Sequence, residues 1–402
     1  MKVLLFTNLY PSSREPTKGM YNLQSFQALA RYCEARVVAP VRWWSRLRRP
    51  RELFTVPLED ATGLPAAYPT YWPVPGRPQS HVSAMRSGLR PYLRRLRREF
   101  PFDIILAAFA YPDGAAAACL AQDFGCPVVI LVFGSDLNDL ADRPALREEV
   151  RSKLQQAQRI IAVSAALRER TIELGIDPEK VVVQRNGVDG ERFRLQDRQE
   201  VRARLGLPAD RRLICTVGNV MHVKGQDVLI EAMGLLRGNE DPCADLALVG
   251  GGYMGAVEVV EKLQARVHEL GLSERVRFLG RRPHEEVADW IGASDVYCLP
   301  SRNEGCPNVV LEALACGRPV VASNVGGVPE LLNAGNGILV PAEDPAALAD
   351  GLRQALNRSW DPEALRNSVE CLSWDQVGQG YFHVLQAALQ EFKRPAAAPA
   401  RS

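Results

Sequence analysis

Short apolar runs alternate with longer amphipathic stretches along almost the whole chain, and this alternation restricts the fold more than any other feature. In the first half, apolar runs typical of buried strands occupy residues 2–6, 34–40, 103–108, 127–133, 159–163 and 180–183. Helical periodicity lies between them, at residues 21–31, 114–124 and 144–157. Strands that alternate with helices favour a parallel sheet with both faces covered.

The same alternation then starts again. Strand-like runs lie at residues 212–217, 244–249, 276–279, 296–299 and 319–322, and helix-like stretches at 226–236, 256–270, 283–293, 309–316 and 328–332. A chain of 402 residues also exceeds what one core usually organises. The sequence therefore predicts an α/β protein with two doubly wound, Rossmann-like domains. Ligands of such sheets bind beyond the carboxyl ends of the strands, so we expect a site in a cleft between two facing sheets.

The expected domain boundaries follow from these patterns. The N-terminal domain would span residues 1–190, a polar and charged linker 191–211, and the C-terminal domain 212–375. A last helix at 376–394 would pack back towards the N-terminal domain. The tail at 395–402 is rich in Pro and Ala and is expected to be disordered.

Composition and the N-terminal residues favour a globular protein over a disordered, fibrous or secreted one. An apolar fraction of 47% with 24% charge is ordinary for a soluble globular chain. Nine scattered cysteines without a CxxC pair fit a reducing cytoplasm. The apolar run at the N-terminus is too short for a signal peptide, which needs roughly 7–15 residues. We therefore expect a cytoplasmic protein, with the inner face of the cell membrane as one location.

The most informative stretch follows the predicted strand 296–299. Glu304 falls in the loop, Pro307 suits the first turn of a helix, and Glu312 lies just over one turn into that helix. A helix start offers free N–H groups to an anion, and carboxylates accept hydrogen bonds from hydroxyls. Phosphate together with a polyol describes a nucleotide sugar. The alternative is that Glu304 caps the helix and Glu312 is solvated.

These residues also carry a family resemblance. Glu304 and Glu312 match the E-x7-E motif of retaining glycosyltransferases of the GT-B fold, and the string from Ser301 to Ala322 resembles glycosyltransferase family 4. Shorter motifs occur in the family's order at residues 7–11, 19, 134–136, 185–189, 217–219, 224–225, 249–252 and 326–330. The opening residues and the Gly-Asn-x4-Lys-Gly form resemble bacterial cell-wall and exopolysaccharide transferases of the teichuronic-acid type.

The resemblance assigns roles to individual residues. Glu312 would hold the ribose hydroxyls of the donor, Glu304 would approach the donor sugar, and Lys224 would neutralise the diphosphate. Glu304 and Lys224 are therefore the expected catalytic pair. The other expected donor-binding residues are Gly19, Gly218, Asn219, Arg282, Gly305, Cys306, Pro307, Asn308 and Val309. The expected acceptor-binding residues are Asp136, Arg185 and Asn186, and for Asp136 local capping of the next helix is an equal alternative.

Two positions depart from the family pattern. Asn219 stands where the family commonly has an arginine that contacts the diphosphate, so either Lys224 with helix N-termini suffices or Arg14 or Arg185 supplies the charge. Phe133 stands where many members have a histidine that touches the transferred sugar. No Asp-x-Asp motif is present, and we expect no metal and no other cofactor.

The resemblance implies retaining transfer of a sugar from a UDP- or GDP-sugar to a glycan or lipid-linked glycan in bacterial surface polysaccharide synthesis. A nucleotide-sugar epimerase of the same fold and a sugar-nucleotide-binding protein without catalysis remain open.

Positive charge gathers in the N-terminal half, where residues 42–99 hold twelve arginines, no lysine and four acids. Such a patch suits phosphate, acidic glycans or an anionic membrane surface. Six of these arginines recur with apolar residues in a helix-like stretch between residues 85 and 98, and Trp43 and Trp44 lie beside four others. A basic amphipathic helix on a membrane and a solvated helix packed on its own domain both fit the pattern. No nucleic-acid-binding motif is found.

Overall fold

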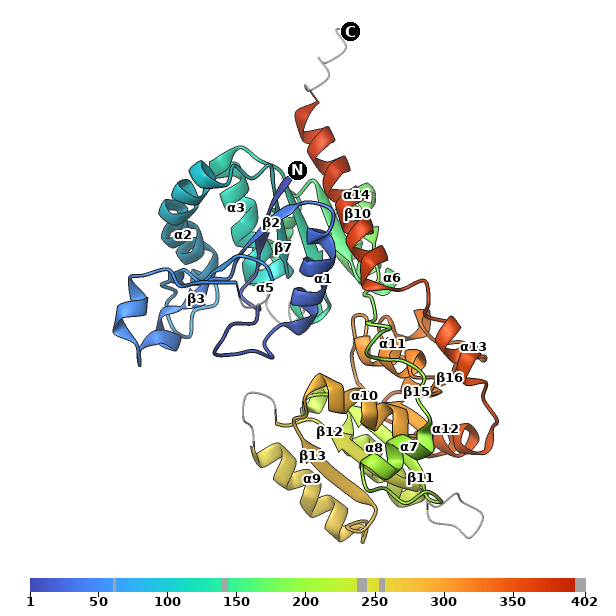
Figure 1. Ribbon diagram of the computed structural model, residues 1–402. Helices are drawn as coiled ribbons and strands as arrows, with labels where there is room; N and C mark the ends of the chain where they lie inside the picture. Colours follow the sequence, from blue (N-terminus) through green and yellow to red (C-terminus); the bar gives the residue numbers. More distant parts are fainter. Residues whose placement is uncertain (61–62, 139–143, 237–243, 253–256, 395–402) are drawn as a thin grey trace. The chain divides into compact units, whose positions relative to one another are not determined.

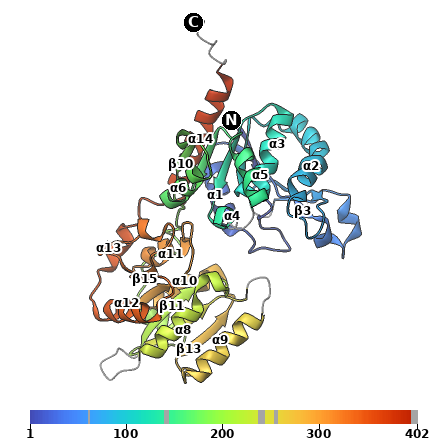
Figure 2. The same ribbon diagram turned by 180° about the vertical axis from the view of Figure 1, so that it is seen from behind.

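The computed structural model describes residues 1–60, 63–138, 144–236, 244–252 and 257–394. They form two compact units, one made of Met1–Asn186 with the segment from Trp374 onward, and one made of Gly187–Ser373. Each unit contains its own sheet (Figures 1 and 2).

The first unit contains a sheet with the order β10-β9-β8-β7-β1-β2-β5-β4, in which all pairs except β4–β5 are parallel. Figure 1 shows α2, α3 and α5 on one side of this sheet and α1 with α14 on the other. The strands are β1 (Lys2–Phe6), β2 (Glu34–Val38), β4 (Leu58–Glu59), β5 (Ala66–Ala67), β7 (Ile104–Ala108), β8 (Val128–Val132), β9 (Arg159–Ala162) and β10 (Val181–Val183). A separate short pair joins β3 (Val41–Arg42) and β6 (Thr70–Tyr71). The helices are α1 (Met20–Ala30), α2 (Ser80–Glu99), α3 (Ala115–Phe124), α4 (Ser135–Asn138), α5 (Pro144–Leu154), α6 (Ala165–Glu173) and α14 (Trp374–Lys393).

The second unit contains a wholly parallel sheet with the order β13-β12-β11-β14-β15-β16. Its strands are β11 (Arg212–Val217), β12 (Ala244–Val249), β13 (Val276–Gly280), β14 (Val296–Leu299), β15 (Val320–Ser323) and β16 (Gly337–Val340). Its helices are α7 (Arg198–Arg204), α8 (Gln226–Leu235), α9 (Val257–Glu269), α10 (His284–Ala293), α11 (Asn308–Ala315), α12 (Pro345–Asn357) and α13 (Pro362–Asn367). The apolar faces of α8, α9 and α12 share one core with the sheet.

The strands predicted from apolar runs are confirmed to within two residues at each end. The helix expected at 328–332 is wrong, because only a 3-10 turn forms at Val328–Glu330. Pro329 lacks a backbone donor, which disfavours a continuing helix. The pattern also missed β16 and α12, which follow this turn.

The predicted linker at 191–211 is also wrong, because α7 lies there and packs against α10 within the second unit. Arg202 on α7 is buried and donates hydrogen bonds to the Ala293 carbonyl at 2.9 Å and to Asp295 at 2.7 Å. This charged segment can therefore be buried in the second unit, because its guanidinium group is paired with polar partners.

The last helix, α14, belongs to the first unit and packs along α1 (Figure 1). The two backbones come so close that a side chain at Gly378 would place its Cβ 2.4 Å from the carbonyl of Ala28. The expected disordered tail at 395–402 lies outside the described residues.

Helix α2 buries its apolar face inside the first unit, through Val82, Met85, Leu89, Leu93 and Leu96. Of the two interpretations that the sequence left open, the structure shows the helix packed on its own domain. In the described part of the chain, no helix combines the length and the apolarity needed to cross a bilayer.

Candidate functional site

The carboxyl ends of neighbouring strands in the second unit bring together residues far apart in sequence. Strands β11 and β14 are adjacent in the sheet. The loop after β11 carries Lys224, and the loop after β14 carries Ser301 and Glu304. Because parallel strands end at the same edge, the two loops meet.

A charged cluster forms where they meet. The Lys224 ammonium lies 2.7 Å from Glu304 Oε1, and the Ser301 hydroxyl donates to the same oxygen at 2.7 Å. The Glu304 side chain is only 9% exposed, and that of Lys224 is 28% exposed. The structure thus brings the two predicted catalytic residues together. Ser301 is a further member, and the S-x-x-E spacing was the signal that could have identified it.

Glycines let the loops approach one another. Gly225 has φ of +65°, and a Cβ there would lie 1.9 Å from the Pro300 carbonyl oxygen. Gly326, after β15, has φ of +50°, and its Cβ would lie 1.9 Å from the carbonyl oxygen of Glu304. Any side chain would push these loops apart, so glycine fixes the geometry of the cluster.

Arg302 holds the loop after β14 against the loop after β11. Its backbone N–H donates to the Val223 carbonyl at 2.8 Å, and its guanidinium donates to the His222 carbonyl and to Asp227. Bidentate pairing of this kind is among the stronger polar contacts in proteins. Sequence reasoning missed this role because an arginine in a loop gives no local sign of its partner.

Glu312 lies on α11 and is buried, with 8% of the residue exposed. Burial raises the pKa of its carboxyl group to about 7, and nearby Arg192 acts in the opposite direction. The alternative of a solvated Glu312 is therefore wrong. A buried carboxyl group with a pKa of about 7 is about half protonated at pH 7, and its protonated form can both donate and accept hydrogen bonds.

Helix α11 begins at Asn308, one residue before the expected stretch 309–316, and Pro307 is its N-cap rather than a residue of its first turn. Cys306 and Pro307 are buried, whereas Gly305, Asn308 and Val309 are partly exposed. The start of the helix thus lies in the loop that carries Glu304, as the sequence predicted.

Three other predicted donor residues differ in their surroundings. Gly218 continues the sheet by donating to the Val249 carbonyl, and Asn219 is exposed at the end of β11. Arg282 is exposed and bound within its own turn, to the Leu279 carbonyl and to Glu286. Its neighbour Arg281 instead lies beside Gly251, in the glycine-rich turn after β12. Donor contact by these residues stays a prediction.

The remaining predicted residues lie in the first unit. Gly19 has φ of +67°, and its Cβ would lie 2.2 Å from the Leu9 carbonyl oxygen, so the turn itself requires glycine. The Asp136 carboxylate accepts hydrogen bonds from the N–H groups of Ala110, Phe133 and Gly134. These bonds fix the loop after β8 and tie it to Ala110, but none of the three donors belongs to α4, so both helix capping and acceptor binding by Asp136 stay predictions.

Arg185 and Asn186 follow β10; Asn186 is buried and Arg185 is half-buried. Arg14, one of two arginines suggested to replace the missing charge, forms a bidentate pair with Glu52. The Phe133 ring packs against Tyr21 and Phe109, with centroids 5.4 and 5.0 Å apart, so this position is an apolar aromatic cluster.

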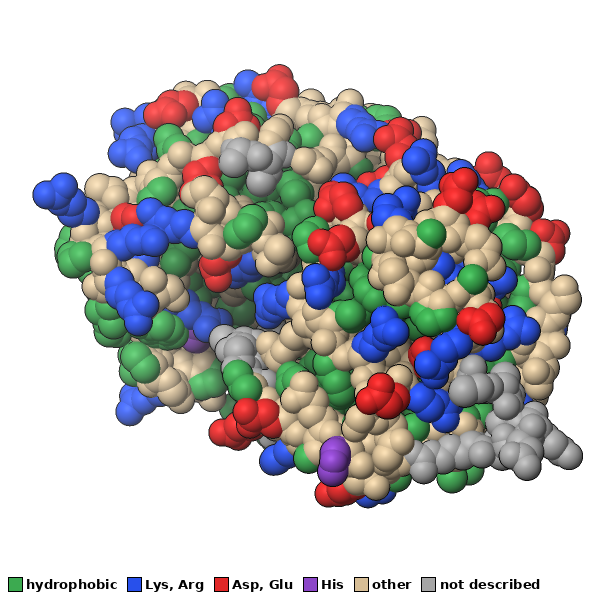
Figure 3. All heavy atoms as spheres, turned by 60° about the horizontal axis from the view of Figure 1, so that its bottom comes forward, with side chains coloured by type: hydrophobic (Ala, Val, Ile, Leu, Met, Phe, Trp, Pro, Cys, Tyr) green, Lys and Arg blue, Asp and Glu red, His purple; other side chains and the backbone are tan. Residues whose placement is uncertain are grey.

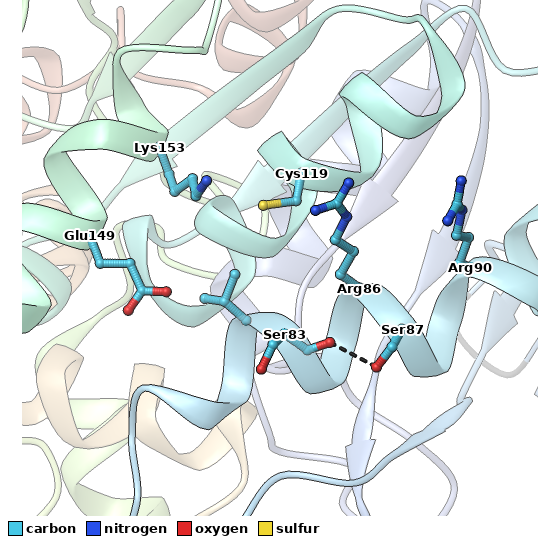
Figure 4. A pocket seen from close by; sticks show the side chains of 8 residues that line it. Ser83, Arg86, Ser87, Arg90, Cys119, Glu149 and Lys153 are labelled. Carbon is cyan, nitrogen blue, oxygen red and sulfur yellow. Dashed lines mark hydrogen bonds between the residues drawn. The ribbon is translucent and has the colours of Figure 1, made fainter.

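A hollow of about 350 Å³ lies elsewhere in the first unit, among α2, α3 and α5 (Figure 4). Arg86, the most prominent cation in it, is already bound to Asp123 at 2.7 and 2.9 Å. The hollow is lined by Val82, Ser83, Arg86, Ser87, Arg90, Cys119, Glu149 and Lys153. None of the predicted site residues lines it, so it is separate from the cluster in the second unit.

Comparison with known proteins gives matches to both halves of the chain. Residues 25–192 match the family model "Glycosyltransferase Family 4", and residues 197–370 match "Glycosyl transferases group 1". The glycosyltransferase TuaC of Bacillus subtilis (strain 168), assigned to teichuronic acid biosynthesis, is 31% identical over 92% of this chain and 93% of its own.

Two solved structures are similar in fold. HepE of Anabaena, crystallised in complex with UDP, has a TM-score of 0.74 at 21% identity, covering 96% of this chain and all of HepE. Sucrose-phosphate synthase of Thermosynechococcus elongatus has a TM-score of 0.79 at 22% identity, covering 97% and 99%. These likenesses confirm the GT-B fold with two Rossmann-like domains.

Proposed function

The chain belongs to glycosyltransferase family 4, and we propose that it transfers a sugar, with retention of configuration, from a UDP- or GDP-sugar to a glycan or lipid-linked glycan. The observation that carries this proposal is the cluster of Lys224, Glu304 and Ser301 at the strand ends of the second unit, together with Glu312, which is buried on α11, the helix that follows the Glu304 loop. HepE, which shares the fold, binds UDP in its crystal structures.

The proposed chemistry is electrostatic. The bond between the anomeric carbon and the diphosphate oxygen breaks, which leaves negative charge on the diphosphate and positive charge on the sugar. Lys224 and the N–H groups at the start of α11 would stabilise the leaving group. The acceptor hydroxyl would attack from the face that the diphosphate leaves, and its proton would pass to the departing phosphate oxygen.

Before the donor binds, Lys224 is held by Glu304 at 2.7 Å. This pairing keeps the ammonium at the strand ends, so the cation is in place when the diphosphate arrives. Glu304 would then accept hydrogen bonds from hydroxyls of the donor sugar. Glu312, buried and about half protonated at pH 7, would bind the ribose hydroxyls.

The proposal includes no divalent metal, because Lys224 and helix N–H groups supply the positive charge. It places the enzyme in the cytoplasm, at the inner face of the membrane, where a lipid-linked acceptor would be found. Teichuronic acid biosynthesis, to which TuaC is assigned, is an example of a surface-polysaccharide pathway.

The test is label transfer. Purified protein is incubated with radiolabelled UDP- and GDP-sugars and a bacterial lipid extract, with and without EDTA. We expect label to enter the lipid fraction from one nucleotide class, equally in EDTA, and the product linkage to keep the donor's anomeric configuration. Glu304→Gln should abolish transfer while nucleotide binding persists.

Other outcomes would overturn the proposal. Conversion of the donor sugar to its epimer without transfer would identify the epimerase alternative. Nucleotide binding without turnover across a broad set of acceptors would identify a binding protein. Inversion of configuration would contradict the proposed attack geometry.

A further inference from the structure

A lobe of the first unit, residues 42–60 and 63–79, exposes an unusual set of apolar side chains. Phe54 is 84% exposed, Leu58 74%, Leu47 57%, Val74 49% and Trp72 47%. Single exposed apolar residues are common, but several in one segment mark an interaction surface. The lobe is the part of the first unit that contains β3 and β6 (Figure 1).

The exposed rings are held in a cluster. The rings of Trp43 and Trp72 are stacked, with centroids 5.9 Å apart and planes within 13°. Phe54 lies 6.0 Å from Trp72, and Trp44 lies 5.7 Å from Trp43. The Trp43 indole N–H donates to the Pro73 carbonyl at 3.1 Å, which fixes the ring. The surface therefore exists before any partner arrives.

Arginine surrounds these rings. Arg42, Arg48, Arg49, Arg51 and Arg77 are exposed, whereas the acids among the lobe's described residues are Glu52, Glu59 and Asp60. Two of these acids are engaged, since Glu52 pairs with Arg14 and Glu59 accepts hydrogen bonds from Ser13. Figure 3 shows Lys and Arg side chains beside hydrophobic ones at its left end.

Arg46 is buried in the lobe and links its segments. Its guanidinium donates to the carbonyl oxygens of Glu52 and Tyr68 and to the Thr70 hydroxyl, at 2.5–2.9 Å. These contacts join separate segments of the lobe around a buried charge whose two terminal nitrogens are both hydrogen-bonded.

The lobe is also attached to the loop after β1. Tyr68 donates to the Pro11 carbonyl, and Ser13 and Arg14 bind Glu59 and Glu52. This loop lies at the carboxyl end of β1 and leads to Gly19, so a surface bound by the lobe would lie beside the ligand edge of this sheet.

We propose that this lobe docks the protein on an anionic lipid surface, with Phe54, Leu58 and Trp72 entering the interface and the arginines lying over the headgroups. Aromatic residues partition to membrane interfaces, and basic residues are attracted to anionic lipids. Helix α2 cannot insert in this way, because its apolar face is buried. The inference deepens the proposed function, and rests on it, by naming the surface that would bring the enzyme to a lipid-linked acceptor.

The test is vesicle binding without nucleotide or acceptor. The full chain is sedimented with vesicles of phosphatidylglycerol and phosphatidylcholine (1:1), and with phosphatidylcholine alone, in 0.1 M salt. We expect binding to the anionic vesicles only. An arginine near the surface contributes about fivefold to partition, so Arg48→Gln, Arg49→Gln and Arg51→Gln together should weaken binding about 100-fold. The pair Phe54→Ser and Leu58→Ser should weaken it at least tenfold.

Matched control variants distinguish docking through the lobe from non-specific attraction between a basic protein and anionic vesicles. Arg94→Gln, Arg95→Gln and Arg98→Gln remove the same charge from the exposed face of α2 and should weaken binding less than tenfold. Leu235→Ser with Val257→Ser removes exposed apolar groups from the second unit, where they are 52% and 62% exposed, and should have no effect. All these residues are exposed, and thermal unfolding verifies the fold of each variant.

The proposal would be overturned if the arginine variants of the lobe and of α2 lost vesicle binding equally. It would also be overturned if the variant with Phe54→Ser and Leu58→Ser bound anionic vesicles as well as the wild type does. Concentration-dependent dimers that these two substitutions abolish would show that the occupant is a second copy of the chain. Vesicle binding and sugar transfer are measured separately, so a protein that binds vesicles but transfers nothing would leave the docking inference intact and remove the proposed function.

Discussion

Replacing Glu312 with glutamine should make the protein more stable and weaken its donor binding. The carboxyl group is buried on α11, and burial raises its pKa from 4.5 to about 7. The folded state therefore holds this proton more tightly than the unfolded state does. Its contribution to stability is fully present below pH 4.5 and is lost as the pH rises through about 7.

The magnitude follows from the two pKa values. A pKa of about 7 in place of 4.5 corresponds to about 3 kcal/mol once the group is ionised. Glutamine keeps the shape without the charge, so at pH 8 Glu312→Gln should raise the unfolding free energy by up to about 3 kcal/mol. For a unit of this size, that is about 6–12 °C in the melting temperature. At pH 5 the gain should fall below about 1 kcal/mol.

The assay is calorimetric unfolding at pH 5 and pH 8, with and without UDP. The control is Glu261→Gln, which removes an exposed carboxylate from α9 in the same unit and should leave both melting temperatures unchanged. UDP should raise the melting temperature of the wild type but much less that of Glu312→Gln. If Glu312→Gln instead lowers the melting temperature equally at both pH values, the carboxylate stabilises the fold as an ion and the reasoning fails.

Three further predictions concern the loops and the lobe. Gly225→Ala should lower the free energy of unfolding by more than about 3 kcal/mol, because its Cβ would overlap the Pro300 carbonyl. Gly206 has nearly the same φ but open space around it, so Gly206→Ala should lower the free energy of urea unfolding by about 1–2 kcal/mol. Equal losses would show that backbone conformation alone requires glycine. Lys224→Met should lower kcat by about 10²–10³-fold while the fold persists, as judged by circular dichroism, and near wild-type turnover would remove Lys224 from the mechanism. Arg46→Met should lower the free energy of unfolding by about 2–3 kcal/mol and make the lobe sensitive to limited proteolysis, because the carbonyl oxygens that accept hydrogen bonds from Arg46 lose their donor. An unchanged cleavage pattern would show that Arg46 does not hold the lobe.

Much of the fold could be predicted because the second sheet is wholly parallel and the first is parallel except for the β4–β5 pair, so their buried strands are continuous apolar runs. The linker could not, because α7 is charged and its burial depends on Asp295, about 90 residues away in sequence. The β16 strand was missed for a related reason, since Ile338 and Leu339 stand among glycines and only pairing with β15 makes a strand of them.

The sequence located the candidate site through a motif that contains Glu304 and Glu312, whose roles stay predictions. The residues that position the site could not be predicted. The contacts of Arg302 with the loop after β11 and the proximity of Arg192 to Glu312 come from tertiary packing. The sequence showed the charge of the lobe, but only the structure shows that Phe54 and Trp72 are exposed while the apolar face of α2 is not.

We propose that the strand ends of the second unit hold a nucleotide sugar through Lys224 and Glu312. Titration calorimetry with UDP, GDP, ADP and CDP, repeated in EDTA, tests it most directly. We expect UDP or GDP to bind the wild type in EDTA. Lys224→Met and Glu312→Ala should each weaken this binding at least tenfold, and Glu261→Gln should not. Binding that neither substitution affects, or no binding of any nucleotide, would contradict it.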